Sequence, residues 1–337
     1  MGKKRTKKKK TFAETVKKKT PRKPFRNVKE DGVTYSFLDE WLLDREQARL
    51  SFVEGWSSSG LAVPLDFGLA FHDCLEWIAK GRSPKTIKKK ILDPYFERRM
   101  KSKNKLRPDE VTKLRELLAV AKVLFEEYAY YWSEADKDFQ YIFQEASFKV
   151  DHTLPSGLTM PLRGRWDAVY KENGKIWLME NKTKGQIDEE GILASLPFDL
   201  QTMLYVYCLQ KHLGQKVEGV LYNVIRRPGL RRKKTEQIEE FVDRIQDDVV
   251  KRPQHYFMRW RVEFLEEDIE NWVSKSLDPI LEQVMQWWLS IQSNPFEPWD
   301  SPLHYQNPSA LFTRYGRSRY FDLITRNRTT GLYRREK

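Results

Sequence analysis

Two carboxylates and a lysine lie in one short segment, and the turn inside this segment predicts how they face each other. Asn173-Gly174 separates two strand-like runs, and this dipeptide is typical of a two-residue type I′ hairpin turn. With the turn centred there, Asp167 faces Glu180 across the strands, with Cβ atoms about 4.5 to 5.5 Å apart. Lys182, two residues beyond Glu180, projects from the same face.

Facing carboxylates repel each other, so this pair needs a cation. A divalent ion between Asp167 and Glu180 removes the conflict, and two hard oxygen ligands suit Mg²⁺ or Mn²⁺. A neighbouring lysine can orient or deprotonate a metal-bound water, or stabilise a pentavalent phosphate. The alternative is a solvent-facing hairpin whose acids are neutralised by Arg165 and Lys182.

Further motifs lie before and after the hairpin, and their order along the chain is recognisable. The chain contains Gly68-Leu-Ala-Phe-His72, then Glu145, Asp167, Glu180-Asn181-Lys182 and finally Gln201-Thr-Met-Leu-Tyr205. Together they resemble the PD-(D/E)XK nuclease superfamily, and within it the RecB-like exonuclease branch. The resemblance spans roughly residues 65–225. The proline of the family name is replaced by tryptophan, and the four-cysteine cluster and the helicase of some relatives are missing.

The resemblance implies a role for each matching residue. The expected metal ligands are His72, Glu145, Asp167, Glu180 and the carbonyl of Asn181. Lys182 would act on the attacking water, while Gln201 and Tyr205, one helical turn apart, would brace the site or touch the DNA backbone. Three of these residues also have ordinary structural interpretations: His72 and Tyr205 as core residues, and Glu145 as an exposed acid on a strand.

The function implied is metal-dependent hydrolysis of DNA phosphodiester bonds by an exonuclease acting in recombination, repair or phage genome processing. The expected cofactor is one or two Mg²⁺ or Mn²⁺ ions, with no iron–sulfur cluster and no nucleotide. DNA, linear duplex or single-stranded, is the expected partner, with a single-strand-annealing or replication protein as a further one. Two alternatives stay open: an endonuclease or structure-specific nuclease with the same site, and a non-catalytic DNA-binding or assembly protein that kept the fold.

All the excess positive charge lies at the N-terminus. Residues 1–29 hold 14 of the 61 Lys and Arg and one of the 48 Asp and Glu, which is the whole net charge of +13. Because like charges repel and little apolar surface is present, this segment is expected to be a disordered basic arm. It would bind phosphates without sequence preference, or serve as a solubilising tail or a localisation signal.

Composition excludes several other classes of protein. No apolar run approaches the roughly 18 to 20 residues of a membrane span, and no apolar stretch follows the lysines as in a signal peptide. Two cysteines, Cys74 and Cys208, are too few for a disulfide framework or an all-cysteine cluster. A phosphate-binding G-x-x-x-x-G-K-[ST] loop is absent from the sequence. Composition therefore favours an intracellular protein, and the resemblance implies the cytoplasm of a bacterial or phage-infected cell.

The hydrophobic pattern predicts an α/β fold with a small mixed sheet flanked by helices, and the resemblance implies that this is a restriction-endonuclease-like core. Helices are expected from Ser36 to Val53, at 67–80, after Pro108, and at 199–213, 235–250 and 266–292; strands are expected at 141–150, 160–170, 175–184, 217–226 and 256–264. The predicted organisation is the arm over 1–29, a helical subdomain over 30–138, the nuclease core over 139–264, and a long helix with surface loops over 265–337.

A basic loop follows the strand predicted at 217–226. Its sequence, Arg226-Arg-Pro-Gly-Leu-Arg-Arg-Lys-Lys234, combines a Pro-Gly turn with six cations. We expect Arg226, Arg227, Arg231, Arg232, Lys233 and Lys234 to bind a phosphate backbone.

Overall fold

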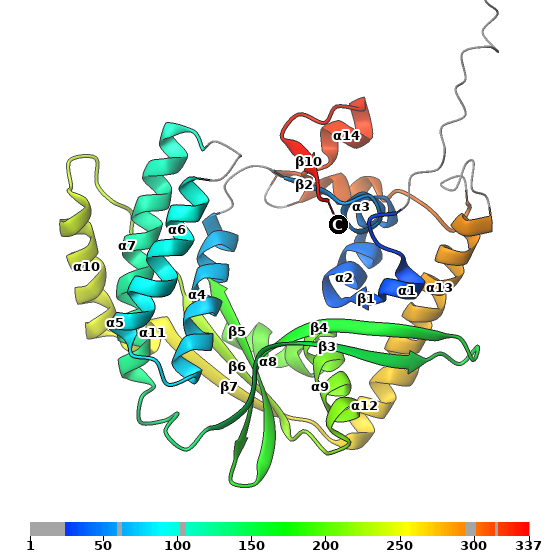
Figure 1. Cartoon of the computed structure of the whole chain (residues 1–337), viewed down its shortest axis with the longest axis horizontal. Coiled ribbons are helices and arrows are strands. Elements are labelled where there is room, and N and C mark those ends of the chain that lie inside the picture. Colours follow the sequence, from blue (N-terminus) through cyan, green and yellow to red (C-terminus); the bar gives the residue numbers. More distant parts are fainter. Residues whose placement is uncertain (1–23, 59–62, 102–105, 294–300, 314–315, 337) are drawn as a thin grey trace, which may run out of the picture.

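One six-stranded mixed sheet forms the centre of the computed structural model, which describes residues 24–58, 63–101, 106–293, 301–313 and 316–336 (Figure 1). The strand order is β1-β4-β5-β6-β7, and β3 pairs with β4 outside this path. β1 is parallel to β4 and β5 is parallel to β6, whereas the other pairs are antiparallel. The strands are β1 (Val33–Thr34), β3 (Gln140–Thr153), β4 (Thr159–Glu172), β5 (Lys175–Lys184), β6 (Gly219–Arg226) and β7 (Phe257–Glu263).

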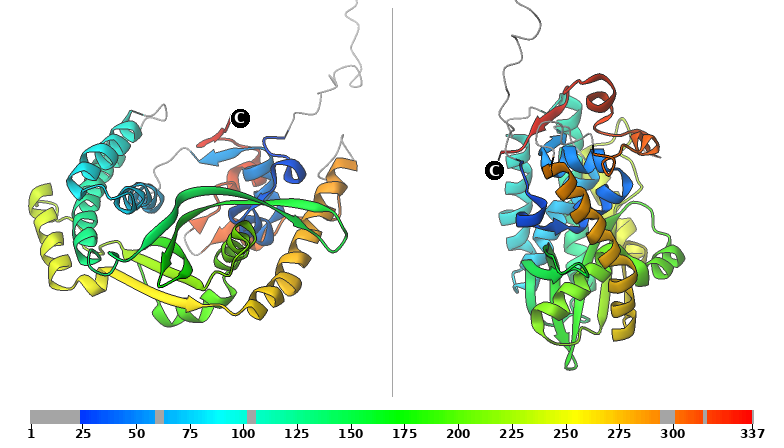
Figure 2. Two further views of the ribbon diagram at one scale, coloured as in Figure 1. Left: turned by 60° about the horizontal axis from the view of Figure 1, so that its bottom comes forward. Right: turned by 90° about the vertical axis from the view of Figure 1, so that its right-hand side faces the viewer.

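Two groups of helices stand at opposite ends of this sheet (Figures 1 and 2). One group shares a buried apolar cluster and contains α4 (Val63–Ala79), α5 (Pro84–Ile87), α6 (Asp93–Met100), α7 (Pro108–Tyr131), α10 (Ile238–Lys251) and α11 (Pro253–Tyr256). The other shares a second cluster and contains α1 (Val28–Asp31), α2 (Tyr35–Leu43), α3 (Arg45–Ala48), α9 (Leu200–Leu213), α12 (Glu266–Trp272) and α13 (Asp278–Ser293). A short helix, α8 (Glu189–Ser195), precedes α9. The predicted α/β architecture, a mixed sheet flanked by helices, is confirmed.

The segment predicted to be a helical subdomain contributes to both clusters. Its first part, up to Val53, packs with the cluster that contains α9 and α13, and β1 adds to the sheet beside β4. From Phe67 onward, α7 included, it packs with α10 and α11. The two parts therefore lie on different sides of the molecule.

The hairpin turn has the predicted geometry. Asn173 and Gly174 have φ angles of 50° and 79°, and a type I′ turn requires positive φ at both central residues. Glu172 pairs with Lys175, and the register continues up to the pair of Ala168 and Met179. The turn therefore fixes which residues of β4 and β5 face each other.

Helix α9 begins and ends as expected. Asp199 caps α9 by accepting hydrogen bonds from the backbone N and the hydroxyl of Thr202, at 2.8 and 2.9 Å. Gly214 ends the helix in the left-handed conformation. The long helix predicted over 266–292 is instead divided, because a π-helical stretch, Val273–Leu277, separates α12 from α13.

The described residues after 300 correct the prediction of surface loops. They contain the two-residue strands β8 (Phe312–Thr313) and β9 (Gly316–Arg317), helix α14 (Phe321–Arg326) and strand β10 (Leu332–Arg334). β10 pairs with β2 (Trp56–Ser58), and the buried Tyr320 donates from its hydroxyl to the carbonyl of Trp56 at 2.9 Å. A large aromatic side chain with a satisfied hydroxyl attaches this segment to the body of the protein.

The predicted basic arm lies mostly outside the described residues, which begin at 24. Its last part belongs to the fold: the backbone N of Phe25 donates to Val53 O at 2.6 Å, and Asn27 caps α1. In the described part of the chain no single helix is long and apolar enough to cross a membrane; by length and composition only, the bent pair Glu189–Phe198 and Leu200–Leu213 passes together.

Candidate metal and active site

The β4–β5 ladder ends one pair before Asp167 and Glu180. Beyond Ala168 and Met179 the strands separate, and β5 continues its pairing with β6 as far as Lys184. The predicted register is therefore confirmed up to the last pair, and the two acids lie where the ladder opens. Asp167 Oδ2 accepts a hydrogen bond of 2.8 Å from the backbone N of Asn181, so its carboxylate is held against β5.

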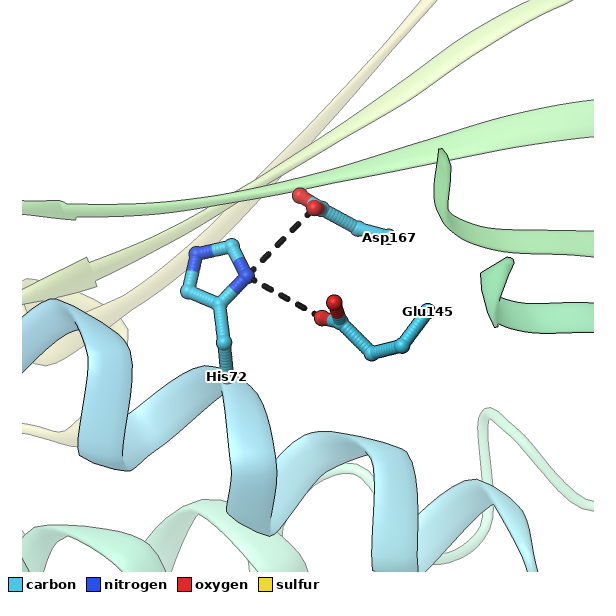
Figure 3. A group of neighbouring side chains, drawn as sticks. All are labelled: His72, Glu145 and Asp167. Carbon is cyan, nitrogen blue, oxygen red and sulfur yellow. Dashed lines mark hydrogen bonds and ion pairs between the residues drawn. The ribbon is translucent and has the colours of Figure 1, made fainter. Parts of the chain in front are cut away.

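His72, Glu145 and Asp167 form a group whose ligand atoms all lie within 4.8 Å of one another. His72 Nδ1 is 3.4 Å from both Asp167 Oδ1 and Glu145 Oε1 (Figure 3). The three side chains come from α4, β3 and β4. One imidazole nitrogen and two carboxylates suit a divalent transition metal such as Mn²⁺, and the carboxylates also suit Mg²⁺.

Gly68 lets α4 bring His72 to the sheet. A Cβ atom at Gly68 would lie 3.2 Å from Thr183 Oγ1 on β5, which is tighter than an ordinary contact. His72 follows one helical turn later on the same face. The Gly-x-x-x-His spacing thus combines a close helix–strand approach with a nitrogen ligand aimed at β4.

Glu145 occupies an unusual backbone position. Its neighbours pair as Gln144 with Ala168 and Ala146 with Trp166, so Glu145 faces Asp167, but its φ of 45° is left-handed. Such a conformation is costly for a residue with a Cβ atom and clusters at functional sites. The side chain is only 7% exposed, and Glu145 Oε2 is 3.0 Å from the Arg165 guanidinium.

The charges in this group are strongly coupled. Burial acts to lower the pKa of His72, but the carboxylates of Asp167 and Glu145 outweigh it and raise the pKa to about 10. Burial acts to raise the pKa of Asp167, yet His72, Lys182 and the Asn181 amide hold it below its usual value. The two carboxylates thus already hold one cationic group, the His72 imidazolium, between them, and a metal ion bound at His72 Nδ1 would take the place of its proton.

Glu180 lies apart from these three residues, in a more deeply buried position. It is 1% exposed, and among the described residues no donor other than Lys182 reaches its carboxylate. Lys182 Nζ lies 2.9 Å from Oε2 as an ion pair. Burial raises the pKa of Glu180, partly offset by Lys182. A buried carboxylate needs partners for both oxygens: Lys182 supplies one to Oε2, and an adjacent metal ion would supply one to Oε1.

Lys182 is an ammonium in this arrangement. Burial acts to lower its pKa, but Glu180 and Asp167 outweigh burial and raise the pKa above its usual value. Gln201 Oε1 accepts a hydrogen bond of 2.7 Å from Lys182 Nζ. The structure therefore brings Gln201 to the site through the lysine.

Tyr205 packs beside the site. Its ring meets Phe148 edge-on at 5.4 Å, and its carbonyl accepts a bond of 3.2 Å from Trp166 Nε1. Burial, followed by the charge of Glu180, raises the pKa of the Tyr205 phenol to about 12. Its side chain is half-buried.

A buried polar network holds Asn181 from behind. Asn223 Nδ2 donates to Asn181 Oδ1 at 2.6 Å and to Tyr128 OH at 2.8 Å, and Arg259 Nε donates to Asn223 Oδ1 at 3.0 Å. Arg259 in turn pairs with Asp136. The sequence contained one signal for this network, a lone asparagine in the apolar strand 219–225, which must find a partner when buried.

The basic loop after β6 divides into two parts. Arg232 is paired with Glu116 at 2.6 Å and also donates to the carbonyl of Glu236, so its charge is used within the fold. Arg231, Lys233 and Lys234 are exposed. Arg226 is the last residue of β6 and Arg227 follows it, and each has a buried Nε without a hydrogen-bond partner among the described residues.

Comparison with known proteins gives one family. The family model described as the PD-(D/E)XK nuclease superfamily matches residues 40–278 of the chain, and this range includes every site residue above. No curated protein matches this chain. A solved structure described as "Crystal structure of SSO0001" is 13% identical, covers 80% of this chain and 98% of its own, and has a TM-score of 0.28.

Proposed function

We propose that this chain, which belongs to the PD-(D/E)XK nuclease superfamily, is a DNA exonuclease of the RecB-like branch. Superfamily membership indicates a metal-dependent nuclease, a phosphodiester hydrolase. The preference for DNA ends, the branch and the biological process are the proposal. Recombination, repair or phage genome processing in the cytoplasm of a bacterial or phage-infected cell is the role that fits it.

One observation carries the proposal: His72, Glu145 and Asp167 converge within 4.8 Å beside the ion pair of Glu180 and Lys182. The first three would hold a divalent ion, and Glu180 Oε1, which has no hydrogen-bond partner among the described residues, would complete its surroundings. When bound, a Mg²⁺ or Mn²⁺ ion supplies Lewis-acid polarisation of the phosphate and a more acidic water.

The remaining steps belong to the chain's own residues. The Lys182 ammonium stabilises the negative charge that develops on the phosphate and orients the attacking water, because Glu180 keeps it protonated. Gln201 fixes the position of Nζ, and the backbone N of Asn181 fixes Asp167. We propose that Tyr205 supports this arrangement by packing beside it.

The arrangement of two motifs supports the RecB-like branch. Gly68 permits the close approach of α4 to β5, and His72 joins the acidic group from that helix. Gln201 reaches the catalytic lysine from α9. Both motifs thus contact the hairpin in a way that fits the roles implied by the resemblance.

The test is digestion of linear duplex, linear single-stranded and covalently closed circular DNA with Mg²⁺ or Mn²⁺, and in parallel with EDTA. The variant is Lys182→Ala. Lys175→Ala is the matched control, since Lys175 lies at the other end of β5 and pairs with Glu218. We expect loss of linear DNA only, abolished by EDTA and by Lys182→Ala and retained by the control.

Other outcomes separate the alternatives. Cutting of circles would move the function to an endonuclease that uses the same site. DNA binding without degradation, unaffected by Lys182→Ala, would replace the catalytic proposal with a binding or assembly role. Degradation that survives EDTA would contradict the metal site itself.

A further inference from the structure

Two cations lie just beyond the catalytic lysine on the same face of the sheet. Lys184 follows Lys182 by two residues on β5, so its Cα lies ~7 Å farther along the strand. Arg226 is the residue of β6 that pairs with Lys184 in the parallel register. Paired residues of adjacent strands point to the same side, so Lys182, Lys184 and Arg226 share one face.

Lys184 and Arg226 are like charges on neighbouring strands, an arrangement that destabilises a sheet unless an anion lies between them. Within the described residues, neither forms an ion pair with a carboxylate. Arg226 also has a buried Nε without a hydrogen-bond partner. Two other cations of the sheet are neutralised by carboxylates: Lys175 by Glu218 and Arg261 by Glu172.

The surroundings of Lys184 add positive charge. The ammonium groups of Lys182 and Lys184 lie over one aromatic ring, that of Tyr222, at 6.0 and 5.8 Å from its centroid. Burial and then the charge of Lys182 lower the pKa of Lys184, and Asp199 offsets this only in part. The Asp199 carboxylate is already bonded to Thr202 at the start of α9.

On the basis of the proposed function, we propose that Lys184 and Arg226 form a phosphate subsite that binds the DNA phosphate next to the one attacked. Lys182 and the acidic group act on the scissile phosphate, and the two cations hold its neighbour in register. The shared chemistry is a phosphate group, either an internal phosphodiester or a terminal phosphate. The subsite aligns the strand and makes no contact with the reacting atoms.

The test combines protein variants with DNA in which one phosphate is made neutral. Short linear duplexes carry a single methylphosphonate at each linkage in turn, and a second series carries a phosphate or a hydroxyl at the end. Binding is measured by fluorescence anisotropy in EDTA, and cleavage is measured separately with Mg²⁺. The variants are Lys184→Gln and Arg226→Gln, with Lys184→Arg as the charge-retaining variant and Lys175→Gln as the control.

We expect Lys184→Gln to weaken binding of unmodified DNA roughly ten-fold, the effect of losing one charged hydrogen bond. The salt dependence, log Kobs against log salt, should become shallower by ~0.9 for duplex DNA. At one linkage, a methylphosphonate should weaken DNA binding by wild type about as much as Lys184→Gln does, and it should not weaken binding by Lys184→Gln any further. Arg226→Gln should show the same loss of effect at the same linkage. In cleavage, KM should rise with little change in kcat.

If the variants lose affinity only for DNA with a phosphorylated end and not for DNA with a hydroxyl end, the subsite binds a terminal phosphate. If the variants are instead insensitive to one internal methylphosphonate, the subsite binds a phosphodiester. The subsite is overturned if the losses of affinity caused by the variant and by the methylphosphonate add at every linkage, or if Lys175→Gln causes the same loss. Normal binding by Lys184→Gln overturns it as well, and retained binding by Lys184→Arg excludes a folding defect. Coupled binding without any cleavage would refute the proposed function and leave the subsite standing.

Discussion

Glu145 faces Asp167 across the β3–β4 ladder while its own backbone is left-handed, so a strained residue lies where two like charges meet. Strain of this kind costs about 1–2 kcal/mol and persists when the rest of the fold imposes it. Here it directs a carboxylate toward His72 and Asp167. The left-handed conformation of Glu145 therefore destabilises the β3–β4 ladder locally, and it places the Glu145 carboxylate where it could bind a metal ion.

Replacing Glu145 by glycine tests whether the backbone strain at this position lowers the stability of the metal-free protein. Glycine adopts a φ of 45° without a Cβ conflict, and the relief of about 1–2 kcal/mol is at least as large as its entropic cost of about 0.5–1 kcal/mol. We expect metal-free Glu145→Gly to melt at the wild-type temperature or above, while the rise in Tm caused by Mn²⁺ is lost. Glu145→Gln, which keeps the strain and removes the charge, is the control. A Glu145→Gly variant less stable than Glu145→Gln would contradict the strain.

Divalent metal should stabilise the folded protein. An ion present at 100 times its Kd stabilises the fold by about 2.7 kcal/mol, which raises Tm by a few degrees for a chain of this size. Differential scanning fluorimetry of EDTA-treated protein with added Mg²⁺ or Mn²⁺ measures the shift. Asp167→Asn should abolish it, and Asp151→Asn, an exposed acid on β3, should retain it. No shift at millimolar metal in wild type would refute the site.

How much of this site the sequence predicts depends on the sequence distance between the residues. Asn173-Gly174 specifies the register of β4 and β5 locally, so turn chemistry predicted the pairing up to Ala168 and Met179, the pair next to Asp167 and Glu180. Glu145 was reached only through the family resemblance. A register shift between Tyr141 and Phe143 and the left-handed backbone set its position, and neither leaves a signal in the hydrophobic pattern.

The buried polar network that holds Asn181 could not be predicted from the sequence in this way. Asn223 lies 42 residues from Asn181 and 95 from Tyr128, so its contacts depend on how β6 packs between β5 and α7. Tyr320 and Trp56 meet across 264 residues for the same reason. Local propensity carries no information about such partners, and only a lone polar residue in an apolar strand marks them.

Arg259→Met should be strongly destabilising. The Arg259 side chain is 7% exposed and serves Asp136, Tyr128 and Asn223 at once. Removing one partner of a buried pair costs about 3–5 kcal/mol, because the other charge stays buried. Arg261→Met is the matched control on the same strand, since its side chain is 43% exposed and its pair with Glu172 contributes about 1 kcal/mol or less. Equal losses in urea unfolding would contradict the buried network.

Acid should weaken the packing of the α3 region through Glu46. Burial acts to raise the pKa of Glu46, but Arg49 and His304 outweigh it and lower the pKa to about 2, from 4.5 when unfolded. A depressed folded pKa gives stability that is present above pH 4.5 and is lost as pH falls toward 2, on the order of 3 kcal/mol. Glu46→Gln should lower stability at pH 6 and flatten its fall between pH 5 and 2. Parallel pH profiles for variant and wild type would count against this assignment.

Gln201 should affect the rate of the reaction more than the binding of DNA. Its Oε1 accepts a hydrogen bond of 2.7 Å from Lys182 Nζ, so Gln201→Ala removes one of the contacts that position the ammonium and leaves the ion pair with Glu180. Because small misplacements of a catalytic group are costly, we expect kcat to fall at least ten-fold, with KM within about two-fold of wild type. Gln210→Ala is the control, since Gln210 lies on the same helix and bonds to Glu266 at the surface. If Gln201→Ala raised KM and kept kcat, the glutamine would contact DNA, and its role as the positioning residue for Lys182 would be wrong.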